Sequence, residues 1–131
     1  MRCILLGLIL TASSLGAAGP RFVGSWKGDL EGLTAIRLAV DEHAGRLSGS
    51  IVFYLIRRDE KGARIDGDYR SELLRVATQG RRMTFEVKHH VSHGSPKLGP
   101  NVKFLFELED ENTGTLKKAS EGDSLRLVRE R

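Results

Sequence analysis

Cysteine is almost absent from this sequence of 131 residues, since Cys3 is its only example. One cysteine cannot form an internal disulfide, so the chain is not one of the disulfide-stapled scaffolds common among small exported domains. No apolar run reaches the roughly 18 residues that a membrane-spanning helix needs, because Thr11, Ser13 and Ser14 interrupt the longest one. We therefore expect no stable membrane insertion and a fold that depends on its own core.

A block of charges of one sign is also missing. The 21 Lys and Arg residues are interspersed with 17 Asp and Glu residues. No basic stripe is visible of the kind that follows a phosphate backbone. We expect no nucleic-acid partner.

The first 18 residues have the order of a secretory signal peptide. Arg2 supplies the positive start, Ile4 to Leu10 form an apolar run, and the residues from Ala12 to Gly19 are mostly small. We expect cleavage near Ala18, and a mature protein that is secreted or periplasmic. Residues 19–131 are then one domain of ordinary size.

Beyond this leader, apolar residues alternate with polar ones, as in a strand with one buried face. Ile36, Leu38 and Val40 show the pattern, and short breaks that contain glycine separate the strands as hairpin turns do. No segment has the spacing of a helix. The expected strands are residues 24–30, 34–41, 47–56, 69–78, 83–90, 102–109, 114–119 and 124–129.

The strand pattern predicts an all-β domain. A meander of this length closes into a barrel or folds into a sandwich, because its open edges must be covered. We favour an antiparallel up-and-down β-barrel of about eight strands. Residues 57–70 and 91–100 are interpreted as two long loops, which in a barrel usually surround the mouth.

The third expected strand is apolar on both faces. One face carries Ile51 and Phe53, and the other carries Val52, Tyr54 and Ile56. Either the chain itself covers the second face, or that face binds a second copy or another protein. Both interpretations stay open.

The stretch "FVGSWKGDL" from Phe22 to Leu30 resembles the opening strand of the calycins, the group of lipocalins and intracellular fatty-acid-binding proteins. Gly24, Trp26 and Lys27 match their Gly-x-Trp motif. The resemblance implies a lipocalin-like barrel in which the tryptophan packs across one end. "GSWKGDL", "IRLAV" and "LRLVRE" also resemble small exported bacterial domains, whose function does not transfer.

The sequence departs from the calycin pattern in two places. "EGL" is a tight turn where fatty-acid-binding proteins insert two helices, and "RLVRER" lacks the tyrosine of their carboxylate-binding Arg-x-Tyr. Arg126 could still fill the arginine role. The ligand-binding candidates are therefore Trp26, Phe53, Phe85, Phe104, Phe106 and Arg126, although core filling is the more favoured role of the aromatic residues.

Features for catalysis are few. No serine lies in a Gly-x-Ser-x-Gly elbow, and Gly49, inside the third strand, is better explained by strand bending or a close backbone approach. His89, His90 and His93 are the one group of possible metal ligands, but successive strand residues point to opposite faces. We expect no cofactor and no metal, and an enzyme is the less favoured interpretation.

Two functions fit these observations. The leading one is an exported barrel that binds a small apolar or amphipathic ligand in its interior. The alternative is a solid-core module that docks a protein or an envelope component through its surface, around Val52, Tyr54 and Ile56.

Overall fold

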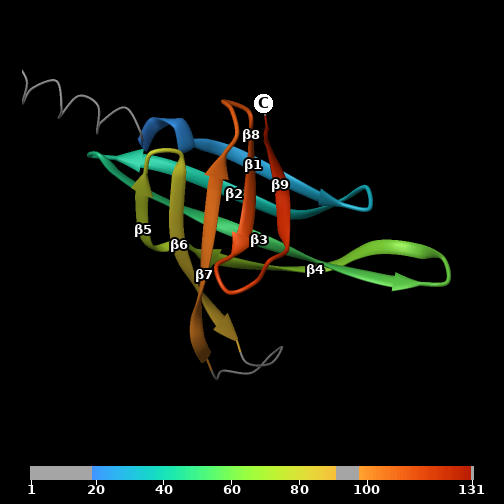
Figure 1. The fold of residues 1–131 in the computed structure, drawn as a ribbon. Helices are drawn as coiled ribbons and strands as arrows, with labels where there is room; N and C mark the ends of the chain where they lie inside the picture. Colours follow the sequence, from blue (N-terminus) through green and yellow to red (C-terminus); the bar gives the residue numbers. More distant parts are fainter. Residues whose placement is uncertain (1–18, 91–97, 131) are drawn as a thin grey trace, which may run out of the picture.

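The computed structural model describes residues 19–90 and 98–130 (Figure 1). The expected leader and His93 lie outside the described residues, so export and cleavage near Ala18 stay predictions. The described chain is all-β, as the sequence predicts. Its elements are η1 (Gly19–Phe22, a 3-10 turn), β1 (Gly24–Leu30), β2 (Leu33–His43), β3 (Arg46–Asp59), β4 (Gly62–Glu72), β5 (Leu74–Gln79), β6 (Arg82–His90), β7 (Leu98–Leu108), β8 (Thr113–Lys118) and β9 (Ser124–Arg129).

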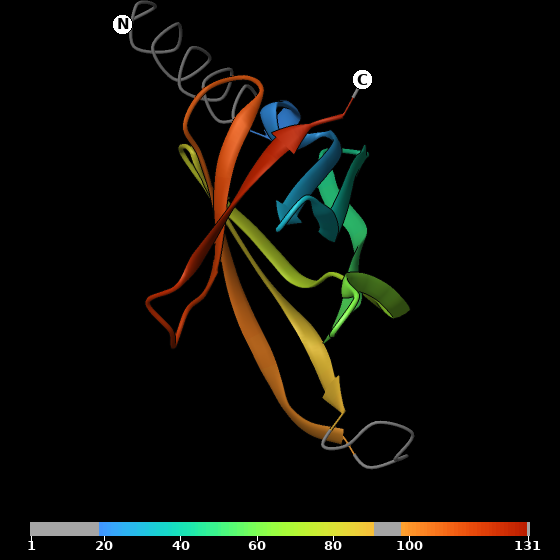
Figure 2. The same ribbon diagram turned by 90° about the vertical axis from the view of Figure 1, so that its right-hand side faces the viewer.

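The nine strands form one antiparallel sheet that curls into a half-barrel (Figure 2). Their order is β4-β3-β2-β1-β9-β8-β7-β6-β5, so all consecutive strands pair except β4 and β5. The first and last strands pair, with Trp26 opposite Arg129. The consecutive strands β4 and β5 do not pair and form the two edges.

The strands β4 and β5 are two halves of one bent segment. The pairing with β3 runs to Glu72 opposite Ser50, and the next amide, Leu73 N, still donates to Gly49 O at 3.0 Å. From Leu74 onward the segment pairs with β6 instead. Both halves run in the same direction, so the chain consists of eight up-and-down segments. The fourth predicted strand is therefore real, but it changes partner at Leu73.

The long loop predicted for residues 57–70 is wrong, because these residues form the outer part of the β3–β4 hairpin. The alternation of apolar and polar residues does not predict this hairpin, because nearly all its side chains are exposed on both faces. Ion pairs between side chains, rather than burial of apolar surface, stabilise this hairpin. Arg57 Nε lies 2.8 Å from Asp66 Oδ2, Arg64 pairs with Asp59, and an Arg58 contact with Glu31 ties the hairpin to the β1–β2 turn.

The tight turns follow the glycine signals of the sequence. Glu31 and Gly32 between β1 and β2 both have positive φ, at 55° and 81°, and Ala44 and Gly45 repeat this at 54° and 80°. Two consecutive residues with positive φ define the two-residue hairpin turn whose twist matches that of the flanking strands. These turns fix the register of β1, β2 and β3.

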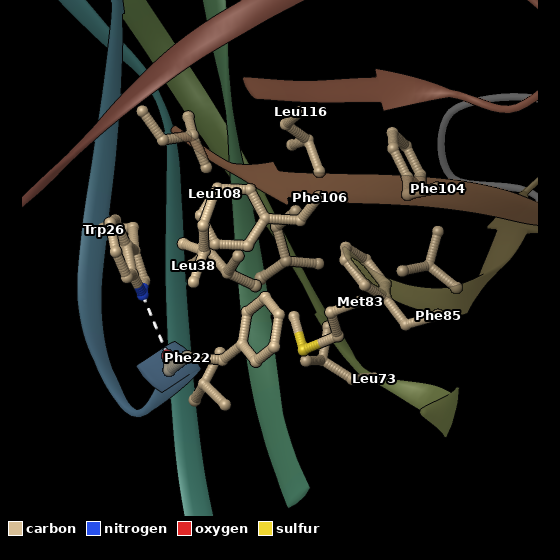
Figure 3. Packing of buried hydrophobic residues seen from close by; sticks show 14 residues of the cluster. Phe22, Trp26, Leu38, Leu73, Met83, Phe85, Phe104, Phe106, Leu108 and Leu116 are labelled. Atoms are coloured by element: carbon tan, nitrogen blue, oxygen red, sulfur yellow. Dashed lines mark hydrogen bonds between the residues drawn. The ribbon is translucent and has the colours of Figure 1, made fainter. Parts of the chain in front are cut away.

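The core fills the concave side of the sheet (Figure 3). It takes one face of β1 to β3 and of β6 to β9, as the alternation predicts, together with Phe22 of η1 and Leu73 between β4 and β5. Its largest members are wholly buried. They are Trp26, Phe22, Phe85, Phe106, Leu38, Ile51, Met83, Leu127 and Val40. The sheet therefore encloses packed side chains over much of its length.

A hydrogen bond joins strand β4 to strand β6, although the two strands are not paired in the sheet. The Tyr69 hydroxyl donates to Lys88 O at 3.0 Å, between strands that do not pair. We expect Tyr69→Phe to lower the free energy of unfolding by about 1 kcal/mol, the typical net value of one hydrogen bond. Urea denaturation measures this loss, and hydrogen exchange should rise in β4 but not in β1. Unchanged exchange in β4 would show that the bond does not hold the two strands together.

Candidate functional site

Trp26 packs across one end of the half-barrel. Its indole Nε1 donates to Phe22 O at 3.0 Å, and its ring meets Phe106 edge-on with the centroids 5.0 Å apart. Phe22 meets Phe106 in the same way at 6.2 Å. Because Phe22 ends η1, this bond fixes the entry of the chain against the first strand (Figure 3).

Arg129 covers the other side of Trp26. Its guanidinium carbon lies 4.2 Å from the centroid of the indole ring, a cation–π contact. The same group donates to three backbone carbonyls: Glu111 O at 2.9 Å, Arg21 O at 2.8 Å and Val23 O. One side chain thus fastens η1, the β7–β8 turn and the tryptophan together.

A surface depression of about 720 Å³ lies beside this cap, and we name it the Arg129 hollow. Two of its polar side chains, Arg129 and Asp110, serve the fold. Arg129 donates to the three backbone carbonyls named above. Asp110 Oδ1 accepts hydrogen bonds from the backbone amides of Asn112 and Thr113 at 2.8 Å each. The Asn112 amide and the Thr113 side chain hold the pKa of Asp110 below its ordinary value. Arg129 and Asp110 are therefore already engaged in contacts that hold the fold.

The aromatic ligand candidates lie on one face of the sheet, but most of them are inaccessible. Trp26, Phe85 and Phe106 have no exposed surface, and Phe104 is 5% exposed. Phe104 stacks on Phe85 with the centroids 5.5 Å apart and contacts the half-buried Phe53 at 5.7 Å. The Trp26 half of the interior is thus filled, and only Phe53 and Phe104 approach an opening.

Arg126 lies apart from these aromatic residues. It is exposed in β9, between the inward Leu125 and Leu127. The arginine that contacts the predicted site is Arg129, which the sequence analysis did not select. One signal could have found it: if the first and last strands of a closed meander pair, a residue near the end of the chain must lie beside Trp26.

A second hollow lies at the other end of the half-barrel, between the β1–β2 and β8–β9 turns. It has a volume of about 530 Å³, and we name it the Leu30 hollow. Its apolar wall contains Leu30, Ala35, Ile36, Phe104, Leu116 and Leu125. Lys117, Lys118, Glu121, Asp123 and Ser124 form its polar side. Leu30 is 51% exposed, so an apolar side chain faces water at the entrance.

The predicted partner surface is partly covered by its own sheet. Val52, Tyr54 and Ile56 are each half-buried. Arg37 Nη1 donates to the Tyr54 hydroxyl at 3.5 Å, and the same guanidinium pairs with Glu130 at 3.3 Å. These contacts support the interpretation that the chain covers this face, and a partner there stays a prediction.

The histidine cluster cannot be placed. His89 and His90 belong to β6, and His93 lies outside the described residues. Within residues 19–90 and 98–130, no three His, Cys, Asp or Glu side chains gather as metal ligands do. In the same part of the chain, no helix is long and apolar enough to cross a membrane.

No family model matches the chain, and comparisons with curated proteins and with solved structures find no match either.

Proposed function

We propose that this protein binds a small apolar or amphipathic molecule in the Leu30 hollow. The observation that carries the proposal is a 530 Å³ hollow with one apolar wall and one charged rim, at the end of the half-barrel that the core leaves open. Its volume lies within the range of small-molecule sites, which are mostly apolar with a few polar groups that orient the ligand.

Burial of apolar surface supplies the affinity. A ligand that covers Leu30 and Ile36 removes exposed aliphatic surface from water, worth about 25 cal/mol per Å². Leu30 is half exposed and Ile36 is partly buried, so both have surface left to cover. A polar head group would stay in water beside Lys117 and Asp123. The ligand thus occupies the mouth, against the apolar wall that contains Phe104 and Leu116.

The first test is a titration of the purified protein with dodecanol, followed through the methyl signals of Leu30, Ile36 and Leu125 and through the melting temperature. We expect saturable shifts and a higher melting temperature, because a ligand that binds only the folded state stabilises it. Leu30→Asp should weaken binding about tenfold, since a lost leucine contact is worth about 1.5 kcal/mol.

Val128→Asp is the matched control. Val128 is 48% exposed, close to the value for Leu30, but it does not line the hollow. It should leave dodecanol binding unchanged. Equal weakening by both variants, or shifts that never saturate, would contradict the proposal.

The alternative function is a solid-core interaction module. It is supported by the packed side chains that fill the Trp26 half of the interior. It requires no cavity, so it predicts that dodecanol and other alkyl ligands leave both the methyl signals and the melting temperature unchanged. The same titration therefore separates the two functions.

A further inference from the structure

We propose that the convex face of strands β5 to β8 binds a phosphate-type oxyanion, at a site that adjoins the Leu30 hollow and shares Phe104 and Lys117 with its lining. A depression of about 440 Å³ lies on this face, and we name it the Lys103 hollow. Three cationic side chains line it: Arg82, Lys103 and Lys117. Thr78, Gln79 and Thr84 add polar groups.

No acidic side chain lines the hollow. Neither Lys103 nor Lys117 forms an ion pair with any described residue. All Asp and Glu residues of the chain lie within the described ranges, 19–90 and 98–130. Arg82 Nε binds Glu107 Oε2 at 3.0 Å. This bond orients the guanidinium and leaves its two terminal nitrogens for another acceptor.

The acidic residue opposite Lys103 in the sheet accepts a hydrogen bond from another side chain. Glu86 is opposite Lys103 in the β6–β7 pairing, but its carboxylate accepts from Asn101 Nδ2 at 3.3 Å. Lys103 and Lys117 are therefore the two cations of the hollow that no described carboxylate pairs with, whereas Arg82 is paired with Glu107.

The strand register places the two lysines on one face of neighbouring strands. Leu105 lies opposite both Thr84 and Lys117, which sets these side chains on one row across three strands. Lys103 lies one step along the same face, and Ala119 N donates to Lys103 O at 2.9 Å, which fixes β7 against the end of β8. Lys103 and Lys117 therefore come from adjacent strands of one face, where a single anion can meet both ammonium groups.

The side chains select the class of anion. Ammonium groups bind phosphate as point charges, and a guanidinium donates to two oxygens at once. The threonine hydroxyls add donors for further oxygens. Three cations with several neutral donors suit a doubly charged, multi-oxygen group better than a single carboxylate. A free phosphate ion and the phosphate of a monoester present the same chemistry.

The test is an NMR titration of the purified protein with sodium phosphate and, separately, with glycerol phosphate, each at a constant ionic strength of about 0.15 M set with chloride. We expect saturable amide shifts at Thr84, Lys103 and Lys117. Lys103→Gln should weaken binding about tenfold, as the loss of one charge-assisted hydrogen bond does. Arg126→Gln removes an exposed cation outside the hollow and should change the affinity less than about twofold.

The two ligands separate the possible sources. Tighter binding of phosphate indicates a free ion, and tighter binding of glycerol phosphate indicates an esterified group. Absence of saturable shifts with both ligands, or equal weakening by both variants, would overturn the proposal. We expect Lys103→Gln to leave dodecanol binding at the Leu30 hollow unchanged. Absence of phosphate binding would therefore contradict this proposal without contradicting the proposed function.

Discussion

Gly49→Ala is expected to lower the free energy of unfolding by about 3 kcal/mol, at the upper end of the usual cost of overpacking. A Cβ atom at residue 49 would lie 1.9 Å from Ala39 O and 3.1 Å from Val40 Cα, both on the paired strand β2. Neither backbone atom can move without breaking the β2–β3 pairing. The strand would have to separate there, and the bond from Leu73 N to Gly49 O would be lost as well.

Urea denaturation monitored through the single tryptophan measures the effect, because Trp26 is fully buried in the folded state. Gly122→Ala is the control, since a Cβ at residue 122 meets nothing within 4 Å. It should change the stability by less than about 0.5 kcal/mol. If Gly49→Ala were as mild as the control, the close approach of β2 and β3 would be wrong.

Arg129→Met should cost about 3 kcal/mol. Methionine keeps some of the aliphatic packing but removes the guanidinium, with its bonds to three backbone carbonyls and its contact over Trp26. Hydrogen bonds from a charged donor and a cation–π contact each contribute on the order of 1 to 2 kcal/mol, and they are not fully additive. We expect η1 to detach and the tryptophan emission to shift to longer wavelength.

Arg126→Met is the comparison that isolates this role. Arg126 lies three residues earlier on the same strand, is exposed, and lies apart from Trp26. It should alter the free energy of unfolding by less than about 0.5 kcal/mol. Equal losses in the two variants would mean that the charge of β9, rather than the contacts of one guanidinium, stabilises this end.

The fold was predictable where one face of a strand is buried. The bounds of β1 and β9 match the predicted residues 24–30 and 124–129, because their inward and outward residues alternate. Gly49 was also anticipated, since a glycine inside a strand marks bending or close approach. Residues 57–70 gave no such signal, because cross-strand ion pairs in water leave no hydrophobic period.

The candidate site was harder to predict, because composition does not distinguish a packed aromatic residue from a ligand-binding one. Phe85 and Phe104 are both core-facing, yet only Phe104 lines the Leu30 hollow. Leu30 was overlooked because it ends a strand, where alternation stops being informative. The Lys103 hollow depends on residues from four strands, and no local pattern in the sequence connects them.

The pairing of the first and last strands bears on how the chain folds. Arg129 and Val23, joined at the Trp26 end, are 106 residues apart in the sequence. Contacts between such distant residues form late, because the entropy of closing the loop is lost before the contact is gained. The hairpins from β1 to β3 can form early, whereas Trp26 remains uncovered until β9 has been synthesised. Completion of the core is therefore the slow step, and a chain truncated before β9 exposes the aromatic surface that promotes aggregation.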